Sequence, residues 1–381
     1  MAIGCATEVA KAPTERKEPI TKVEEVVSRA EGTGPHARHP LTLEQAKRRA
    51  HNSALLLDPD RMIKVWTASD LELYGYALSS DVALAKHAVS EAASRQRLST
   101  LSALDAGVRA AAPQELAVAA VKAALAWHDR DPSLRDLIKV ADAARAHPDR
   151  LVQVHGALML GTMGDTTVLA ELLGVVETQD EWMALRASQS LNRMWGTKYR
   201  THIRAGYDRL DAAQVRYDGR PAVNVSLNAL LYLLAEMGDP RAVSELRTAV
   251  DEDRRFDGQP PPIFLLVRKF GLAESARLER MMKRSLQSRL AAIEALGRLG
   301  DPRGGDLIDA ERLSEVGHKR NLHWRFGLDP YTDFVVAELR AGRKVVMTSG
   351  KWRSENDDMI RQLEREEYLS PRSGRSSSSR P

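Results

Sequence analysis

The chain of 381 residues is 43% hydrophobic and 5% aromatic, enough apolar material for one elongated domain or two to three globular ones, which excludes a chain that is disordered throughout. It has 56 basic and 52 acidic residues, a net charge of +4, so an anionic partner is permitted but not required. One cysteine excludes an internal disulfide framework and a cysteine-based zinc site. Arginine (42) outnumbers lysine (14), which indicates either selection for bidentate contacts or the base composition of the gene.

Residues 1–40 are predicted to form a flexible N-terminal linker, because residues 6–40 are rich in proline, charge and small side chains. The start lacks the basic and apolar regions of a secretory signal. The stretch Ala-Ile-Gly-Cys nevertheless resembles the end of a bacterial lipoprotein signal, which makes Cys5 a lipidation candidate if translation begins upstream. The alternative is an ordinary cytosolic start, so the localisation is either the cell envelope or the cytoplasm.

Residues 41–110 are predicted to form an N-terminal cap with one or two degenerate helical repeats. Thr42 and Gln45 fit the capping box that opens a helix. The segment DVALAKHAVSEAASRQRL, starting at residue 81, is amphipathic with a helical period. No clear junction motif follows either helix, which is typical of the terminal repeats of a solenoid.

Two copies of Gly-Asp-Pro-Arg, at 238–241 and 300–303, each follow a leucine-rich helical pattern. A glycine at this place supplies the positive φ that ends a helix, an aspartate caps the amides of the next helix, and a proline fits its first position. The motif therefore predicts a tight junction between two helices. The residues assigned to these roles are Gly238, Asp239, Pro240, Gly300, Asp301 and Pro302.

Weaker copies of the junction occur at Gly164-Asp165, Gly196 and Gly271, and residues 111–317 are predicted to hold the repeats. The glycines at 164, 196, 238, 271 and 300 are separated by 32, 42, 33 and 29 residues. Such periods are typical of helical-hairpin solenoids. We therefore predict an all-α fold, an α-solenoid or superhelix of about five to seven stacked antiparallel hairpins, flanked by a disordered N-terminal linker and C-terminal tail.

The segment EALGRLGDPRGGDLI at 294–308 resembles the short bacterial HEAT-like repeats, including those of phycobilin lyases, and LLAEMGDPRAVSEL at 233–246 is similar to them. The resemblance covers residues 80–315. It implies a helical-repeat architecture but says little about function, since such repeats serve many proteins.

Residues 318–369 break the repeat pattern and are predicted to form a C-terminal cap or a small appended module. This segment contains a helix pattern at 330–339, a β-prone run at 344–348 and a final charged helix. Residues 370–381 are predicted to be a disordered basic tail.

Sequence motifs for catalysis or phosphate binding are missing, namely Gly-x-Ser-x-Gly, the Walker loop and Gly-x-Gly-x-x-Gly. The ten histidines do not assemble at metal-ligand spacing, and the His-Glu pairs that hold iron in HEAT-like deoxyhypusine hydroxylases do not occur. We therefore expect no metal, no cofactor and no catalytic residue.

Two segments, 193–220 and 268–289, combine an excess of basic residues with aromatic or polar ones. Such a mixture is typical of protein-interface hot spots and also of surfaces that bind nucleic acid. Trp195 is expected to be part of the core, by its register before the junction glycine. The candidate partner-binding residues are Tyr199, Arg200, Arg204, Tyr207, Arg277, Arg280 and Lys283.

The favoured function is a non-catalytic scaffold that binds a protein partner through the inner helices of the solenoid and is tethered to a membrane if Cys5 carries a lipid. One alternative is a nucleic-acid binder that uses the basic helices. The other, implied by the resemblance, is a HEAT-like lyase or glycosylase-type enzyme, which needs a perturbed carboxylate beside Trp or Tyr.

Overall fold

The computed structural model describes residues 38–52, 58–109, 111–214, 216–217, 220–221, 224–313 and 329–356. These residues fold into helices joined by short turns. The one sheet among them consists of two strands of two residues each, β1 (Arg216–Tyr217) and β2 (Arg220–Pro221). The predicted all-α helical-repeat solenoid is confirmed. None of the helices in the described ranges is both long and apolar enough to cross a membrane. Cys5, nearly all of the predicted linker and the predicted basic tail lie outside the described residues.

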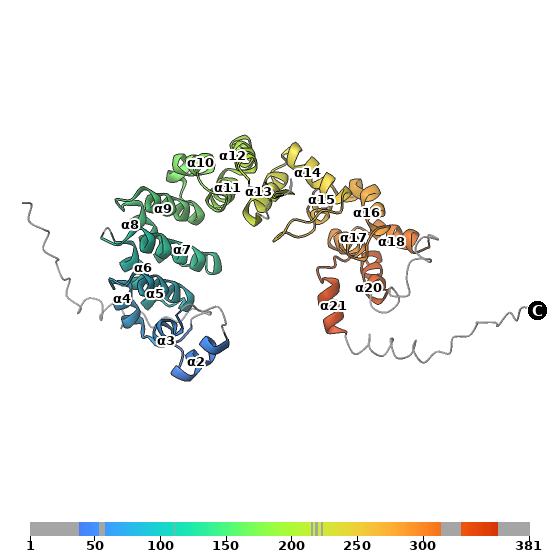
Figure 1. Ribbon diagram of the computed structural model, residues 1–381. Helices are drawn as coiled ribbons and strands as arrows, with labels where there is room; N and C mark the ends of the chain where they lie inside the picture. Colours follow the sequence, from blue (N-terminus) through green and yellow to red (C-terminus); the bar gives the residue numbers. More distant parts are fainter. Residues whose placement is uncertain are drawn as a thin grey trace, which may run out of the picture. The chain divides into compact units, whose positions relative to one another are not determined.

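The chain divides into two compact units, unit 1 up to Val175 and unit 2 from Val176, and each is described by itself. In unit 1, α5, α7 and α9 pack side by side as one layer, and α4, α6 and α8 pack beside them as a second (Figure 1). The helices of unit 1 are α2 (Leu43–Asn52), α3 (Pro59–Thr67), α4 (Asp70–Ala77), α5 (Val82–Arg95), α6 (Leu101–Val108), α7 (Gln114–Arg130), α8 (Ile138–Arg145), α9 (Arg150–Met163) and α10 (Leu169–Thr178), which runs into unit 2. Short 3-10 turns join some of them at η1 (Leu98–Thr100), η2 (Arg135–Leu137) and η3 (Thr166–Val168).

Local sequence rules place the helix starts of unit 1. Ser69 and Glu72 form a reciprocal capping box at the start of α4, and the Asp81 carboxylate accepts hydrogen bonds from the first free amides of α5. The buried face of α5 consists largely of alanine, including Ala85, Ala88 and Ala92. Small side chains let neighbouring helices approach closely, so unit 1 builds its core by tight helix packing with few aromatic rings.

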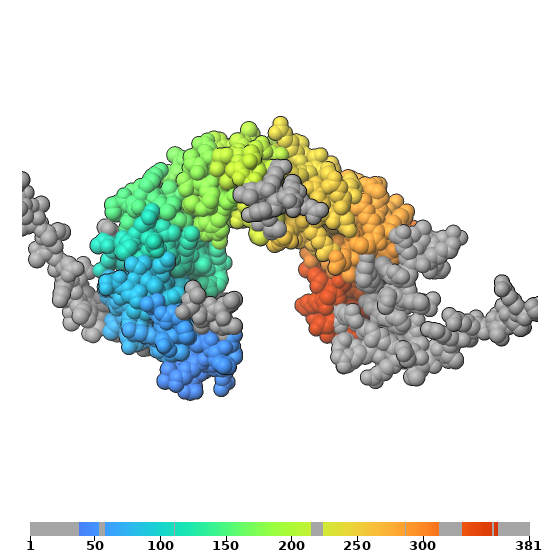
Figure 2. Space-filling view, in the orientation of Figure 1, coloured from blue at the N-terminus to red at the C-terminus, as the bar shows by residue number. Residues whose placement is uncertain are grey.

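Unit 2 repeats the same two-layer arrangement, with α11, α13, α15 and α17 in one layer and α12, α14, α16 and α18 in the other (Figure 1). Their bounds are α11 (Glu181–Trp195), α12 (Arg200–Ala212), α13 (Val225–Glu236), α14 (Pro240–Asp251), α15 (Pro262–Phe270), α16 (Ser275–Met282), α17 (Leu286–Leu299) and α18 (Arg303–Leu313). The layer of α12, α14, α16 and α18 follows the outer side of the curve of this unit. Neighbouring hairpins of unit 2 touch along their surfaces in the space-filling view (Figure 2).

The hairpin junctions are of two kinds. Gly164, Gly238 and Gly300 have φ of +92°, +80° and +73°, and each is followed by an aspartate. Gly196 and Gly271 have φ near +60° with ψ of −134° and −140°, and each opens a 3-10 turn, η4 (Gly196–Tyr199) or η5 (Gly271–Glu274). A junction without aspartate therefore uses a backbone conformation that is essentially restricted to glycine.

The end of unit 2 covers the last hairpin. The helix α20 (Asp329–Arg340) packs on α17 and α18, and α21 (Ser349–Glu355) contacts α20. The β-prone run at 344–348 has no regular secondary structure and belongs to no sheet of the described residues. Its Val345 amide instead donates to the carbonyl of Gly297 in α17, at 2.8 Å, because the missing side chain of Gly297 lets the run approach the helix closely.

Candidate functional site

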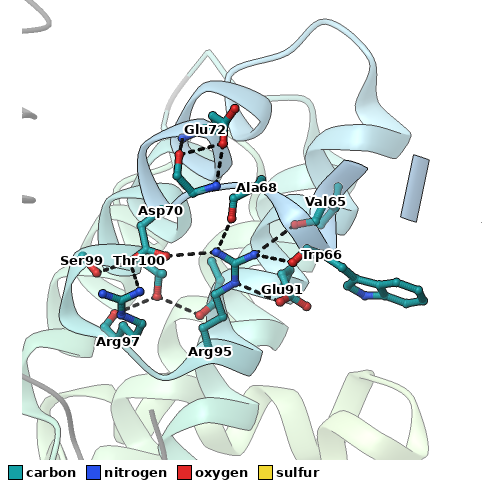
Figure 3. Close-up of polar contacts among 12 residues, drawn as sticks. Val65, Trp66, Ala68, Asp70, Glu72, Glu91, Arg95, Arg97, Ser99 and Thr100 are labelled. Carbon is teal, nitrogen blue, oxygen red and sulfur yellow. Dashed lines mark hydrogen bonds and ion pairs between the residues drawn. The ribbon is translucent and has the colours of Figure 1, made fainter. Parts of the chain in front are cut away.

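A buried arginine organises the N-terminal part of unit 1 (Figure 3). The Arg95 side chain is fully buried at the end of α5, and all five of its N–H groups can be assigned to protein acceptors. Three acceptors are carbonyls at the C-terminal end of α3, and two are carboxylates. The bonds run to Val65 O (3.1 Å), Trp66 O (3.2 Å), Ala68 O (2.6 Å), Asp70 Oδ1 (3.1 Å) and Glu91 Oε1 (3.0 Å).

The Arg95 cluster is electrically balanced, and Arg95 has no donor left for a ligand. Asp70 also accepts a hydrogen bond from Ser99 at 2.5 Å and pairs with Arg97 at 3.2 Å, so two guanidinium groups face two carboxylates. Sequence analysis did not identify Arg95. The signal in the sequence was its position, 11 residues after Leu84 and three after Ala92, which places it on the apolar face of its helix. The cluster is a clamp between α3, α4 and α5.

The candidate residues on α12 mostly bind the next hairpin. Arg200 Nη1 donates to the carbonyls of Met237 (3.3 Å) and Gly238 (3.1 Å) at the end of α13. Arg204 lies 3.7 Å from Asp239 and 3.2 Å from Asp208. These arginines therefore join two repeats, and they lie on the outer layer of unit 2, whereas the sequence analysis assigned partner binding to inner helices.

The aromatic residues near α12 also differ from expectation. Tyr207 was proposed as a surface residue for partner binding, but it is 6% exposed and its hydroxyl contacts Glu245 of α14; a surface position is wrong. Tyr199 is half-buried and meets Trp195 edge to face, with ring centroids 5.8 Å apart. Trp195 was expected in the core and is itself only half-buried. The rings thus form a contact at the hairpin end, at the boundary between core and solvent.

One perturbed carboxylate lies beside a tyrosine. The Tyr207 hydroxyl is 3.4 Å from Glu245 Oε1, and the Arg204 guanidinium lies 5.1 Å from the centroid of the same ring. Burial raises the pKa of Glu245, and burial together with the nearby Glu245 carboxylate raises the pKa of Tyr207. This is the kind of group that the enzyme alternative needs, but it sits where α12 packs on α14.

The candidate residues on α16 are neutralised by carboxylates of neighbouring helices. Arg277 forms a two-pronged pair with Asp251, at 3.1 and 2.9 Å, and Arg280 binds the same carboxylate at 2.8 Å. Hydrogen bonding to Arg277 lowers the pKa of Asp251. Lys283 lies 3.7 Å from Glu311 in α18. The basic segment that the sequence suggested as a phosphate-binding surface is therefore part of an ion-pair network between repeats.

Buried Glu274 extends this network, and sequence analysis did not single it out. It lies in η5 with a side chain 1% exposed, and it accepts from Arg247 (2.9 and 2.5 Å) and from Arg277. Arg284 donates to the carbonyls of Val250 (2.7 Å) and Asp251 (2.5 Å) at the end of α14. The excess of arginine in the sequence thus includes residues that bind the carbonyl ends of helices in adjacent hairpins.

The junction residues occupy helix ends. Asp239 accepts from the Ala242 amide at 2.9 Å, with Pro240 as the first residue of α14, and Asp165 accepts from the Thr167 amide at 2.8 Å, which lowers the pKa of Asp165. Asp301 accepts from the backbone and side chain of Arg303. Pro302 was expected to begin α18, but the helix begins one residue later, because its first turn closes by i→i+3 bonds such as Gly304 N to Asp301 O.

The hairpin junctions of unit 2 also bring exposed cations together. We call the segments 193–200, 236–241, 268–274 and 298–303 the junction edge. Exposed basic side chains on it include Arg193, Lys198, Arg241, Arg268, Lys269, Arg298 and Arg303. Its carboxylates are partly withdrawn from solvent: Asp239 and Glu274 are buried. Throughout the described ranges no group of three or more His, Cys, Asp or Glu is arranged to hold a metal ion.

Comparison with known proteins supports a HEAT-like repeat in one hairpin of unit 2. A family model described as the PBS lyase HEAT-like repeat matches residues 288–310, which span most of α17, the Gly300 junction and most of α18. The resemblance to HEAT-like repeats is thereby confirmed at this hairpin, and the chain is a helical-repeat protein. No curated protein and no solved structure matches the chain.

Proposed function

We propose that this protein is a non-catalytic scaffold that binds a protein partner along the junction edge of unit 2. The observation that supports this most is the set of cationic contacts between consecutive hairpins. At the junction edge, Arg200 and Lys269 bind the end of α13 from either side. These contacts favour a fixed spacing of the exposed loops, and a preorganised surface binds a partner at a lower entropic cost.

The nucleic-acid alternative receives less support. It depends on Arg277, Arg280 and Lys283, and each of these has a carboxylate partner in a neighbouring helix. A phosphate backbone would have to compete with Asp251 and Glu311 for the same cations. Binding through counterion release needs cations that are free to exchange partners.

The enzyme alternative rests on Glu245 and Tyr207. Their hydroxyl–carboxylate contact is part of the packing of α12 on α14, and Tyr207 is buried. A general acid must reach a substrate atom within hydrogen-bonding distance. We therefore assign this pair to the interface between repeats.

Tethering through Cys5 remains part of the proposal. A lipid on this residue would hold the scaffold at a membrane without adding any chemistry, and a second signal is usually needed for stable anchoring. The intact mass of the N-terminal peptide, from cells expressing the gene with its upstream sequence, tests this: a diacylglyceryl-sized addition on Cys5 is expected, and an unmodified Cys5 contradicts it.

Cross-linking of the full chain in its source cells tests partner binding. An amine-reactive reagent, followed by mass spectrometry, is expected to join the partner to Lys198 and Lys269 on the junction edge, both exposed. Lys139 in unit 1, with a side chain 76% exposed, is the matched control and is expected to give few such links. Links confined to Lys139, or binding that disappears on nuclease treatment, would contradict the proposal.

A further inference from the structure

Two cations from different hairpins converge over Gly238. This glycine joins α13 to α14 with φ of +80°. A Cβ atom placed on it would lie 3.7 Å from Arg200 Nη1 and 3.8 Å from Lys269 Nζ. Arg200 comes from the preceding hairpin and Lys269 from the following one. The missing side chain thus leaves open the space that both cations border.

Neither cation is neutralised by a carboxylate of the described residues. Arg200 donates to the carbonyls of Met237 and Gly238, and Lys269 donates to the carbonyl of Glu236 at 2.9 Å. The nearest acidic groups have other partners, since the Glu236 carboxylate pairs with Arg268 and Asp239 pairs with Arg204 and caps α14. The end of α13 attracts cations through its helix dipole, but the carbonyls supply partial charges only, and two full positive charges remain.

The other glycine junctions lack this arrangement. A Cβ on Gly164, Gly196 or Gly271 would meet no atom within 4 Å. At Gly300 the aliphatic part of Lys344 already fills the space, with Cγ 2.5 Å from the virtual Cβ. Gly238 is therefore the junction, among those described, where two charged groups point at one open position.

We propose that Arg200 and Lys269 form, over Gly238, a binding site for a carboxylate of an acidic polypeptide segment on the partner. Both N–H groups of Arg200 Nη1 already donate to carbonyls, so its parallel Nε–H and Nη2–H groups are the pair that can match a carboxylate, and the Lys269 ammonium adds a third donor from the other side. This inference rests on the proposed function and names the chemistry of the partner.

The charges around the site favour an acidic peptide over nucleic acid. Arg268 and Arg204 flank the site and are already paired with Glu236 and Asp239. A polynucleotide carries a phosphate at every step and would bring some of them close to these carboxylates. A peptide can place one carboxylate at the site and uncharged residues on either side, so its charge pattern can match the surface.

Binding of a ten-residue polyglutamate peptide to the full chain, measured by calorimetry at constant ionic strength, tests the site. The double variant Arg200→Gln/Lys269→Gln is expected to bind the peptide about tenfold more weakly, since both charged donors are lost. The control variant Arg280→Gln, which removes an exposed arginine that already has a carboxylate partner, is expected to stay within about twofold. A polyglutamine peptide is expected not to bind.

Inorganic phosphate and a single-stranded oligonucleotide serve as competing probes. Each probe is compared with unlabelled polyglutamate as a competitor for the bound polyglutamate peptide. If phosphate or the oligonucleotide displaces the bound peptide at a lower concentration than unlabelled polyglutamate does, the assignment to a carboxylate is overturned. Equal polyglutamate affinity for the wild type and the double variant would overturn the site itself.

A self-liganded variant provides an independent test. Gly238→Asp places a carboxylate between the two cations, and a left-handed position tolerates aspartate better than most residues. We expect this variant to lose polyglutamate binding and to melt at a higher temperature than Gly164→Asp, whose glycine also has a positive φ (+92°) and has no atom within 4 Å of its Cβ position. Equal melting temperatures with retained binding would contradict the site.

The two levels of the proposal can fail separately. If polyglutamate binds as expected while the cross-linking experiment finds no protein partner, the function is wrong and the anion site stands. If a partner is cross-linked at the junction edge and binds the double variant as tightly as the wild type, the function stands and the carboxylate site is wrong.

Discussion

Unit 1 and unit 2 use the same interaction, an arginine on the carbonyl end of a neighbouring helix, to different effect. In unit 1, Arg95 is fully buried and its donors are all used, two of them by carboxylates. In unit 2, Arg200 is half-buried and its partners are carbonyls alone. A saturated, buried cation can only hold the fold together. A partly exposed cation without a carboxylate partner keeps charge and donors for another molecule.

The largest effect is expected from breaking the Arg95 clamp. Arg95→Gln would leave three carbonyls and the Asp70 and Glu91 carboxylates without their cation, and removing one partner of a buried ion pair costs about 3–5 kcal/mol. Denaturant unfolding, read by hydrogen exchange in α3 to α5, measures the loss. Arg130→Gln is the control: this arginine binds the Ala93 carbonyl at 3.3 Å from an exposed position, and we expect a loss below about 1 kcal/mol. Similar losses in the free energy of unfolding for both variants would contradict the distinction between a buried arginine with all donors used and an exposed one.

The next effect concerns the two kinds of hairpin junction. Gly271→Ala is expected to cost about 2 kcal/mol, because its φ of +60° with ψ of −140° suits glycine alone. Gly164→Ala, in the ordinary left-handed region, is expected to cost about 1 kcal/mol. A Cβ meets no atom within 4 Å at either position, so the difference isolates backbone conformation. Thermal unfolding of the two variants checks the order, and a larger loss at Gly164 would disprove the distinction.

A smaller effect is expected in the ion-pair network of unit 2. Asp251→Asn is expected to cost about 1 kcal/mol at neutral pH, since the carboxylate is 38% exposed and screened by solvent. The folded pKa of Asp251 lies below its ordinary value of 3.8, so its contribution is present above that value and is lost as the pH falls through the lower folded pKa. Unfolding curves from pH 7 to pH 2 should therefore converge for wild type and variant at the acidic end. A constant gap across this range would argue against the ion pair.

The smallest change in stability is expected at the proposed carboxylate site. Arg200→Gln/Lys269→Gln should lower the free energy of unfolding by less than about 1 kcal/mol, because the carbonyls that lose their donors are partly exposed to water. Chemical denaturation of this double variant gives the number. A loss as large as that of Arg95→Gln would show that these cations are clamps too, and the contrast between the units would disappear.

The parts of the fold that follow local rules could be predicted from the sequence. Gly238, Asp239 and Pro240 specify a helix end, a cap and a helix start within three residues, and the same rules revealed the weaker copy at Gly164. The error at Pro302 was a single residue, since the choice between an α-helical and a 3-10 first turn depends on small energy differences.

The pairing of charges between repeats could not be predicted in the same way. Arg277 binds Asp251, 26 residues away, and Arg200 binds the Met237 carbonyl, 37 residues away. The sequence contains many other arginines, and nothing in it indicates which of them make these contacts. Tyr207 was a candidate for partner binding because it lies in a basic segment with aromatic residues, yet its side chain is buried. The candidate site therefore became visible only when the spacing of the hairpins placed Lys269 next to Arg200.

The unequal lengths of the repeats have a consequence for engineering the chain. The step of 42 residues between Gly196 and Gly238 contains the connection with the β1–β2 pair, which joins α12 to α13 at the end of the hairpins away from the junction edge. Loops at that end can therefore be lengthened or exchanged without moving Gly238 relative to Arg200 and Lys269, provided that the contacts of Arg277, Arg280 and Arg284 with the end of α14 are kept. An added residue between α13 and α14 would instead shift Gly238 relative to Arg200 and Lys269. New loop sequences can thus be introduced at one end of the hairpins, whereas the junction edge must keep the spacing of Arg200, Gly238 and Lys269.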